Sequence, residues 1–224
     1  MRKRYDRARY GPSWFEVIFG ALLSLVLGVV LAVSYFVFRP VTRVKELPKD
    51  PIPGMVYYIE GSRDYSNARR LTAKQRFFAK GGSVVVNEDE LNTAANPVTA
   101  PVAPGSEPAP APTTVLTPGA PNFRIHDGLL QITVPMRIKV DMLYVDQIVL
   151  VQAIGTFVRR GEVFAFTPKT VYVGSCPVDR IPRAVDFVMK KVFDSQPVPP
   201  EIAASWSKLA DVTIEGSTLR LTMP

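Results

Sequence analysis

A single segment near the start of the chain limits what this sequence can fold into more than any other. Residues 14–38 carry no charge except Glu16, which lies close to the beginning of the run. With a rise of ~1.5 Å per residue, a helix of this length spans roughly 37 Å and can cross a hydrocarbon core of ~30 Å with some tilt. Aromatic residues lie at both ends, Trp14 at the first and Tyr35 and Phe38 at the second, as expected at two membrane interfaces. The run therefore predicts a single transmembrane helix.

A cleaved signal peptide is the alternative interpretation of this segment. Ala32, Val33 and Ser34 place small residues at the spacing that a signal peptidase recognises. The apolar run is longer than the core of a usual signal peptide, and bulky aromatic residues follow the candidate cleavage site. These two features favour an uncleaved anchor.

The charges around the apolar run predict its orientation. Basic residues are concentrated in the head, residues 1–13, and the positive-inside rule keeps such a head in the cytoplasm. We therefore expect a single-pass protein of the bacterial inner (cytoplasmic) membrane, with its C-terminal domain exported to the periplasm. Without the head and the anchor, the 27 basic and 20 acidic residues lose five and two, so the net charge falls from +7 to +4. No nucleic-acid partner is expected.

Proline-rich stretches divide the remainder of the chain. Residues 39–54 contain several prolines among alternating charges and predict a juxtamembrane spacer. Residues 94–122 are rich in proline and alanine, with Glu107 as their only charge, and this composition predicts a disordered insertion. Residues 55–93 and 123–224 are expected to form one α+β domain.

Local patterns predict the elements of that domain. Residues 64–80 predict a helix with Leu71 and Phe78 on one side, and Asn87 with Glu90 forms a capping box that opens a second, short helix.

Alternation of apolar and polar residues after residue 129 predicts antiparallel strands, with a hairpin turn at Asp127-Gly128. From Pro182 onwards apolar pairs recur every four residues and predict an amphipathic helix on the sheet. The expected fold class is thus α+β, with an N-terminal transmembrane helix followed by an antiparallel sheet packed on a long amphipathic helix.

Few residues in this sequence carry reactive chemistry. A single cysteine, Cys176, and a single histidine, His126, exclude a cysteine zinc cage and any site that needs two imidazoles. The sequence has no phosphate-binding loop, dinucleotide fingerprint or nucleophile elbow. His126 beside Asp127 is explained by the hairpin turn, and Cys176 by a small buried hydrophobe. We expect no enzyme activity, no catalytic residue, no metal and no cofactor.

Two interpretations of the remaining apolar faces stay open. In the first, sheet and helix pack against each other into a filled core. In the second, they enclose an apolar groove for a lipid or acyl chain, because small ligands are held in concave apolar pockets. The residues expected to line such a groove are Phe157, Phe164, Phe166, Phe187, Val188, Val192 and Trp206.

Three phrases in the domain carry a family resemblance: SVVVNEDELN (Ser83–Asn92), FAFTPKTVYVGSCPVDRIP (Phe164–Pro182) and LADVTIEGSTLRLTM (Leu209–Met223). In this order they resemble the YpmS-like and YceB-like membrane-attached proteins and, more distantly, the tubular lipid-binding (TULIP-like) superfamily. The resemblance implies a curved antiparallel sheet wrapped around a long helix with a lipid-sized groove. Cys176 and Val178 stand where that pattern has leucines.

Two functions follow from these observations. The first is a membrane-anchored, non-catalytic domain of the cell envelope that holds a lipid or another hydrophobic ligand. The alternative is a structural or protein-interaction module with a filled core. Such a module would dock an envelope protein partner through the Pro/Ala-rich segment or the basic helix at 64–80.

Overall fold

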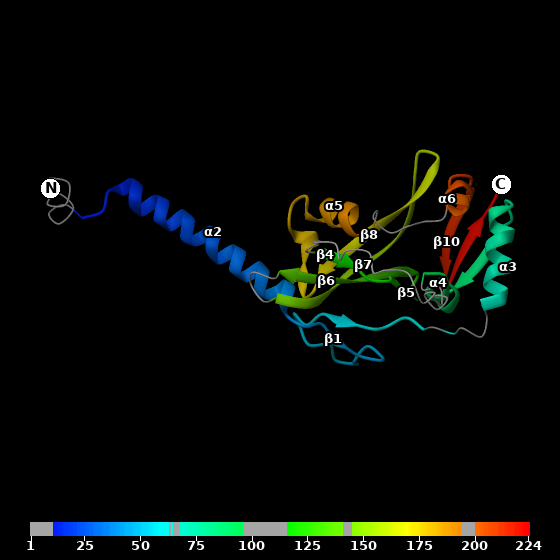
Figure 1. The fold of residues 1–224 in the computed structure, drawn as a ribbon, viewed down its shortest axis with the longest axis horizontal. Coiled ribbons are helices and arrows are strands. Elements are labelled where there is room, and N and C mark those ends of the chain that lie inside the picture. The colour runs from blue at the N-terminus through cyan, green and yellow to red at the C-terminus, as the bar shows by residue number, and fades with distance from the viewer. Residues whose placement is uncertain (1–10, 63, 65–67, 96–115, 141–144, 194–199) are drawn as a thin grey trace, which may run out of the picture.

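The computed structural model describes residues 11–62, 64, 68–95, 116–140, 145–193 and 200–224 (Figure 1). A long helix, α2 (Trp14–Phe38), leads into one side of a mixed α+β body. Two shorter helices, α3 (Ala68–Ala79) and α6 (Pro200–Trp206), lie with the C-terminus at the side of the body farthest from α2. The expected α+β class with an N-terminal apolar helix and antiparallel sheets is confirmed.

A capping box starts α2. The side chain of Ser13 accepts a hydrogen bond from the Glu16 N–H at 3.3 Å, and the Glu16 carboxylate accepts one from the Ser13 N–H at 3.2 Å. The one charge in the apolar run therefore satisfies the helix start. Among the described residues, α2 is the one helix long and apolar enough to cross a membrane. Residues 1–10 of the basic head lie outside the described residues.

The larger sheet is antiparallel and has six strands: β4 (Leu116–Pro118), β5 (Asn122–His126), β6 (Leu129–Val140), β7 (Val145–Arg160), β8 (Val163–Val173) and β9 (Cys176–Pro177). Its order is β4-β6-β7-β8-β9, and β5 pairs with β6 as well. The turn before β6 has φ values of 51° at Asp127 and 69° at Gly128. Two positive φ angles in a two-residue turn are the type I′ geometry, so the predicted Asp-Gly hairpin is confirmed.

β8 is one continuous strand, although it contains Pro168. The pairing with β7 runs from Val163 to Val173, with one register shift: Gly155 faces Pro168 and Ile154 faces Thr170, so Lys169 has no opposite residue. Proline has no N–H to donate, and the bulge beside it on β8 accommodates the missing ladder bond. Gly155 suits this place because a Cβ there would overlap the Thr167 carbonyl oxygen.

A smaller sheet joins the two ends of the domain. The final hairpin, β10 (Asp211–Glu215) and β11 (Thr218–Thr222), extends through β11 onto the early strand β3 (Val84–Asn87). All its pairings are antiparallel, with Leu219 opposite Val86 and Leu221 opposite Val84. A third, parallel pair joins β1 (Thr42–Arg43) to β2 (Tyr57–Tyr58), so the expected spacer at 39–54 contributes a strand to the body.

The long amphipathic helix expected after Pro182 is not confirmed. The structure has a 3₁₀ turn, η3 (Val178–Arg180), a short helix, α5 (Ala184–Val188), and a π-helical turn, η4 (Met189–Phe193). Val188 and Val192 are buried as the pattern predicted, but Phe187 is 64% exposed. The three apolar pairs of the pattern, spaced by four residues, all lie within residues 184–193. The pattern therefore does not require a helix longer than this segment.

The Pro/Ala-rich segment is ordered at both of its flanks. Its first two residues complete α4 (Glu88–Ala95), and Leu116–Pro118 forms the edge strand β4 against β6. Backbone pairing explains this strand, because an edge position tolerates the missing N–H of a proline. Residues 96–115 of the expected insertion lie outside the described residues, as do residues 141–144.

Two apolar clusters fill the interior. The first lies among the smaller sheet, α3, α6 and one part of the larger sheet, and its buried members include Phe78, Leu130, Phe164 and Leu219. The second lies between the larger sheet and the α5–η4 segment and includes Val134, Val151, Val171 and Cys176. Phe166 packs against both clusters and thereby joins them.

The capping box of α4 gives a first testable prediction. The Glu90 N–H donates to Asn87 Oδ1 at 2.9 Å, and the Asn87 N–H donates to Glu90 Oε2 at 3.1 Å. Asn87→Ala removes one of these two bonds and is expected to lower the free energy of unfolding by about 1 kcal/mol. Urea denaturation measures the change. Asn87→Ser retains a capping oxygen and serves as the control, so equal losses in the two variants would contradict a capping role.

Candidate functional site

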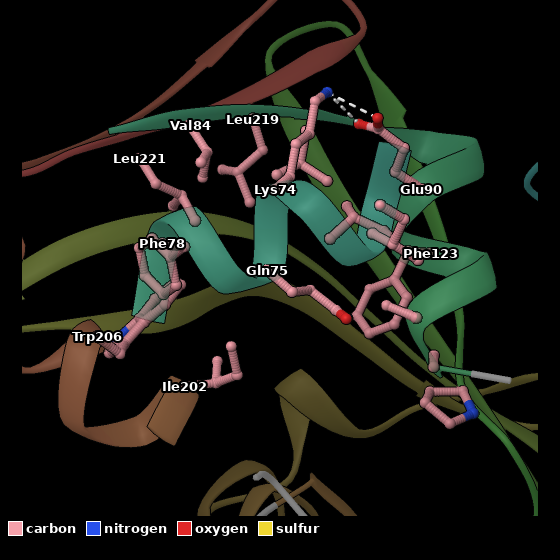
Figure 2. A pocket seen from close by; sticks show the side chains of 16 residues that line it. Lys74, Gln75, Phe78, Val84, Glu90, Phe123, Ile202, Trp206, Leu219 and Leu221 are labelled. Atoms are coloured by element: carbon pink, nitrogen blue, oxygen red, sulfur yellow. Dashed lines mark hydrogen bonds and ion pairs between the residues drawn. The ribbon is translucent and has the colours of Figure 1, made fainter. Parts of the chain in front are cut away.

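A cavity of about 710 Å³ opens between α3, α4, α6 and the smaller sheet. Figure 2 shows its lining, with Phe78, Trp206, Ile202 and Phe123 around the hollow and Leu219 and Leu221 on the sheet side. The helices that contribute its lining, α3, α4 and α6, lie in the part of the body farthest from α2 (Figure 1).

Local periodicity places the apolar side chains of this cavity. Leu71 and Phe78 stand seven residues apart on α3, which is two helical turns, so both occupy the helix face turned to the body. Leu219 and Leu221 alternate with polar residues along β11 and point to one face of the smaller sheet. Two amphipathic surfaces thus face each other, and the space between them is only partly filled.

One ion pair provides the charge at this site. Lys74 Nζ lies 2.6 Å from Glu90 Oε1 and 2.8 Å from Oε2, and it also donates to the Val85 carbonyl at 2.7 Å. The Glu90 side chain is almost fully buried, whereas that of Lys74 is about two fifths exposed. Because each charge has its partner, the pair anchors α3 to α4 and leaves a neutral polar rim beside an apolar interior. Gln75 adds an amide that points into the hollow in Figure 2.

The seven residues expected to form a groove do not form one site. Phe157, Phe164, Phe166 and Trp206 belong to the first cluster, where the Phe157 ring lies 5.8 Å from that of Phe166 and 5.4 Å from that of Trp206. The Trp206 indole N–H donates to the Phe164 carbonyl at 2.8 Å. These aromatic residues fill core volume.

The remaining three residues lie elsewhere. Val188 and Val192 are buried in the second cluster, and Phe187 is on the surface. Trp206 alone among the seven lines the cavity.

Several lining residues were missed at the level of sequence. The apolar side of the predicted helix at 64–80 was the available signal for Leu71 and Phe78. Glu90 was assigned only to helix capping, which hid its second role as the partner of Lys74. Phe123 is the second residue of β5 and lines the cavity, where its backbone is hydrogen-bonded to the Asn92 side chain on α4, a contact that no local pattern reveals.

A second notable contact joins the end of α2 to the body. The Ser175 N–H donates to the Phe36 carbonyl at 3.0 Å, and Ser175 Oγ donates to the Arg39 carbonyl at 3.2 Å. Val33 and Val37 pack against the second cluster. Gly174, with φ of 59°, makes room for this approach, because a Cβ there would overlap the Val37 carbonyl oxygen.

The residues with the greatest chemical reactivity lie away from the cavity. His126 and Asp127 are exposed at the hairpin turn, where Nε2 and Oδ2 are 3.1 Å apart. Cys176 is buried beside the contact with α2, and burial raises the pKa of its thiol. Within the described ranges, no group of three or more histidine, cysteine, aspartate or glutamate side chains is placed to hold a metal ion.

Comparisons with known proteins identify no relative of this chain. No family model, no curated protein sequence and no solved structure matches it.

Proposed function

We propose that this chain is a membrane-anchored, non-catalytic protein of the cell envelope whose domain binds a single-chain amphiphile, such as a fatty acid. The observation that carries this proposal is the cavity between α3, α4, α6 and the smaller sheet. Its volume of about 710 Å³ is within the range of ~300–1,000 Å³ that small-molecule pockets occupy.

The chemistry of the lining favours an amphiphile over a polar metabolite. The walls are leucine, valine, phenylalanine and tryptophan side chains, which gain about 25 cal/mol for each Å² of apolar ligand surface removed from water. Lys74, Gln75 and Glu90 supply the polar groups. An acyl chain would occupy the apolar interior, and its polar head would remain near Lys74 and Gln75.

The contact between α2 and the body supports an uncleaved anchor. Ala32, Val33 and Ser34 lie inside the continuous helix α2, and Val33 and Ser34 are half-buried. The end of α2 supplies packing and hydrogen-bond partners to the body, which cleavage in this segment would disrupt. With a cytoplasmic head, the body would lie on the periplasmic side of the bacterial inner membrane.

A structural or protein-interaction module is the second candidate function. The observation in its favour is that Phe157, Phe164 and Phe166 fill the first cluster instead of lining a groove. In that case an envelope protein partner would dock on the body, and the cavity would bind no amphiphile.

Tryptophan fluorescence offers a direct test, because the chain has two tryptophans and only Trp206 lines the cavity. The full chain carrying Trp14→Phe is reconstituted in lipid nanodiscs and titrated with 9,10-dibromostearic acid. A bound brominated chain is expected to quench Trp206 at micromolar concentration, typical of a ligand held by a drug-sized apolar pocket. Unchanged Trp206 fluorescence up to the solubility limit would refute amphiphile binding and favour the interaction module.

Two matched alanine-to-phenylalanine substitutions test whether the amphiphile binds in the cavity. Ala94 on α4 lines the cavity and is exposed, so Ala94→Phe adds a ring at the cavity wall without replacing a buried side chain. Ala79 is an exposed alanine on α3 that does not line the cavity. We expect Ala94→Phe to weaken quenching at least about tenfold and Ala79→Phe to leave it unchanged. Equal quenching in both variants would place the bound chain elsewhere.

A further inference from the structure

The length of α2 brings the body directly to the membrane surface. The 25 residues of α2 span about 37 Å, which exceeds a hydrocarbon core of ~30 Å by more than one helical turn. The last turns of α2, which extend beyond the hydrocarbon core, belong to the body, because Val33 and Val37 pack against the second cluster. Residues 14–32 remain for the hydrocarbon core, so the body begins where the bilayer ends.

The same contact holds the body in one orientation. The two hydrogen bonds from Ser175 to the carbonyls of Phe36 and Arg39 and the close approach at Gly174 attach the helix end to the strands of the larger sheet. Because α2 crosses the membrane and is attached to the body at several points, the body cannot rotate freely relative to the bilayer. One surface of the body therefore faces the bilayer permanently.

The α5–η4 segment lies on that side of the body. In Figure 1, α5 is at the end of the larger sheet where α2 joins it, while α3 and α6 are at the opposite end. Val188 and Val192 on this segment belong to the same cluster against which Val33 and Val37 pack. We define the α5 surface as the exposed residues Arg180, Ile181, Arg183, Phe187, Lys190 and Lys191.

The composition of the α5 surface fits a bilayer with anionic lipids. Phe187 is 64% exposed and Ile181 37% exposed, although the neighbouring Val188 and Val192 are buried. Four basic residues surround them, and the acidic residues Asp179 and Asp186 offset two of these charges. Exposed aromatic residues flanked by lysine and arginine are the composition of helices that lie in the headgroup region.

We propose that the α5 surface rests on the headgroups of the same membrane that α2 crosses, with Phe187 inserted at the acyl boundary and the basic side chains bound to anionic phospholipid phosphates. This inference rests on the proposed membrane anchorage and is independent of amphiphile binding in the cavity. The α5 surface thereby fixes the orientation of the body. The end of the body near α2 is held at the bilayer, and the end that contains the cavity lies away from it.

The test uses the full chain in nanodiscs of phosphatidylcholine and phosphatidylglycerol whose acyl chains carry bromine near the headgroup. Quenching of Trp14 in the unmodified chain reports that α2 is in the bilayer. In a Trp14→Phe background, the indole introduced by Phe187→Trp is expected to be quenched by about half. The Trp14→Phe chain alone serves as the reference, because Trp206 lies far from α2 and is expected to keep its fluorescence.

Reversing the charge of basic residues tests whether the α5 surface binds anionic lipids or only lies close to the bilayer. Lys190→Glu with Lys191→Glu is expected to reduce the quenching of the Phe187→Trp indole about twofold in anionic nanodiscs. Lys80 and Lys208 come just after α3 and α6, the helices at the end of the body away from α2 (Figure 1). Lys80→Glu with Lys208→Glu is therefore the matched control and is expected to change nothing.

The outcomes distinguish the two levels of the proposal. Quenching of Trp14 without quenching of the Phe187→Trp indole would overturn the α5 surface and leave the anchorage intact. Absence of quenching at Trp14 would overturn both the anchorage and the α5 surface. Quenching of the Phe187→Trp indole that is equal in the two charge-reversed pairs would overturn the role of the basic residues.

Discussion

Gly174→Ala is expected to detach the end of α2 from the body and to expose the one cysteine of the chain. The φ angle of 59° at Gly174 belongs to the left-handed region, where a side chain costs about 1 kcal/mol. A Cβ at this position would also overlap the Val37 carbonyl oxygen, which is backbone and cannot rotate away. The helix end must therefore move, and the hydrogen bond from Ser175 to Phe36 is lost.

Cys176 provides the measurement for this variant. Its side chain is buried in the second cluster, next to Ser175. Burial raises the pKa of the thiol, so at neutral pH it forms less of the reactive thiolate than an exposed cysteine does. In the unmodified chain we expect slow alkylation that accelerates as pH rises towards the raised pKa. Gly174→Ala is expected to increase the alkylation rate at about pH 7.5 at least tenfold, because opening exposes the thiol.

Gly216→Ala is the matched control for the backbone cost. Gly216 has φ of 58°, nearly that of Gly174, but a Cβ there meets open space. Both variants therefore carry the same conformational penalty, and only Gly174→Ala disturbs α2. If the two substitutions accelerate alkylation of Cys176 equally, the fit at Gly174 does not hold α2 against the body.

Asn92→Ala is expected to cause the largest loss of stability among single substitutions near the cavity. Asn92 is fully buried in α4, and its amide makes three hydrogen bonds to backbone groups. Nδ2 donates to the carbonyls of Ser62 and Phe123 at 2.8 and 2.7 Å, and Oδ1 accepts from the Phe123 N–H at 2.6 Å. These bonds join α4, the segment after β2 and the start of β5. Their loss leaves buried backbone groups unpaired, so the free energy of unfolding should fall by about 3 kcal/mol.

A second buried asparagine provides the comparison. Asn122 is almost equally buried, and its Oδ1 accepts one bond from the Gly61 N–H at 2.8 Å. Within the described part of the chain, its Nδ2 has no hydrogen-bond partner. Asn122→Ala is thus expected to cost about 1 kcal/mol. Urea denaturation in nanodiscs, followed by Trp206 fluorescence in the Trp14→Phe background, measures both values. Equal costs would show that the bridge made by Asn92 does not hold these segments together.

Local signals in the sequence were sufficient for several elements. Asn87 and Glu90 form the predicted capping box, Asp127-Gly128 makes the predicted hairpin turn, and residues 14–38 form a continuous helix. Each of these predictions depends on side chains within four residues of one another or on the composition of one uninterrupted run. For that reason these predictions do not depend on how the remainder of the chain packs.

The candidate site was poorly predicted for the opposite reason. Alternation showed correctly that Phe157, Phe164 and Phe166 face inward, but an inward face has the same pattern in a filled core and in a hollow one. The cavity instead lies where α3 and α4 pack beside a strand pair formed by Val84 and Leu221, far apart in the chain. Such pairings between distant segments depend on the packing of the whole body, which no local spacing of apolar residues in the sequence reveals.

The sequence by itself thus determined the apolar helix, the turns, the caps and the inward or outward direction of side chains, because these follow from short-range sterics and hydrogen bonds. Only the tertiary structure decided that β11 pairs with β3, that Gly174 receives the end of α2 and that the space beside Phe78 and Trp206 stays open. Those features arise from the close approach of segments distant in sequence, where the fit of volumes and backbone groups selects one arrangement.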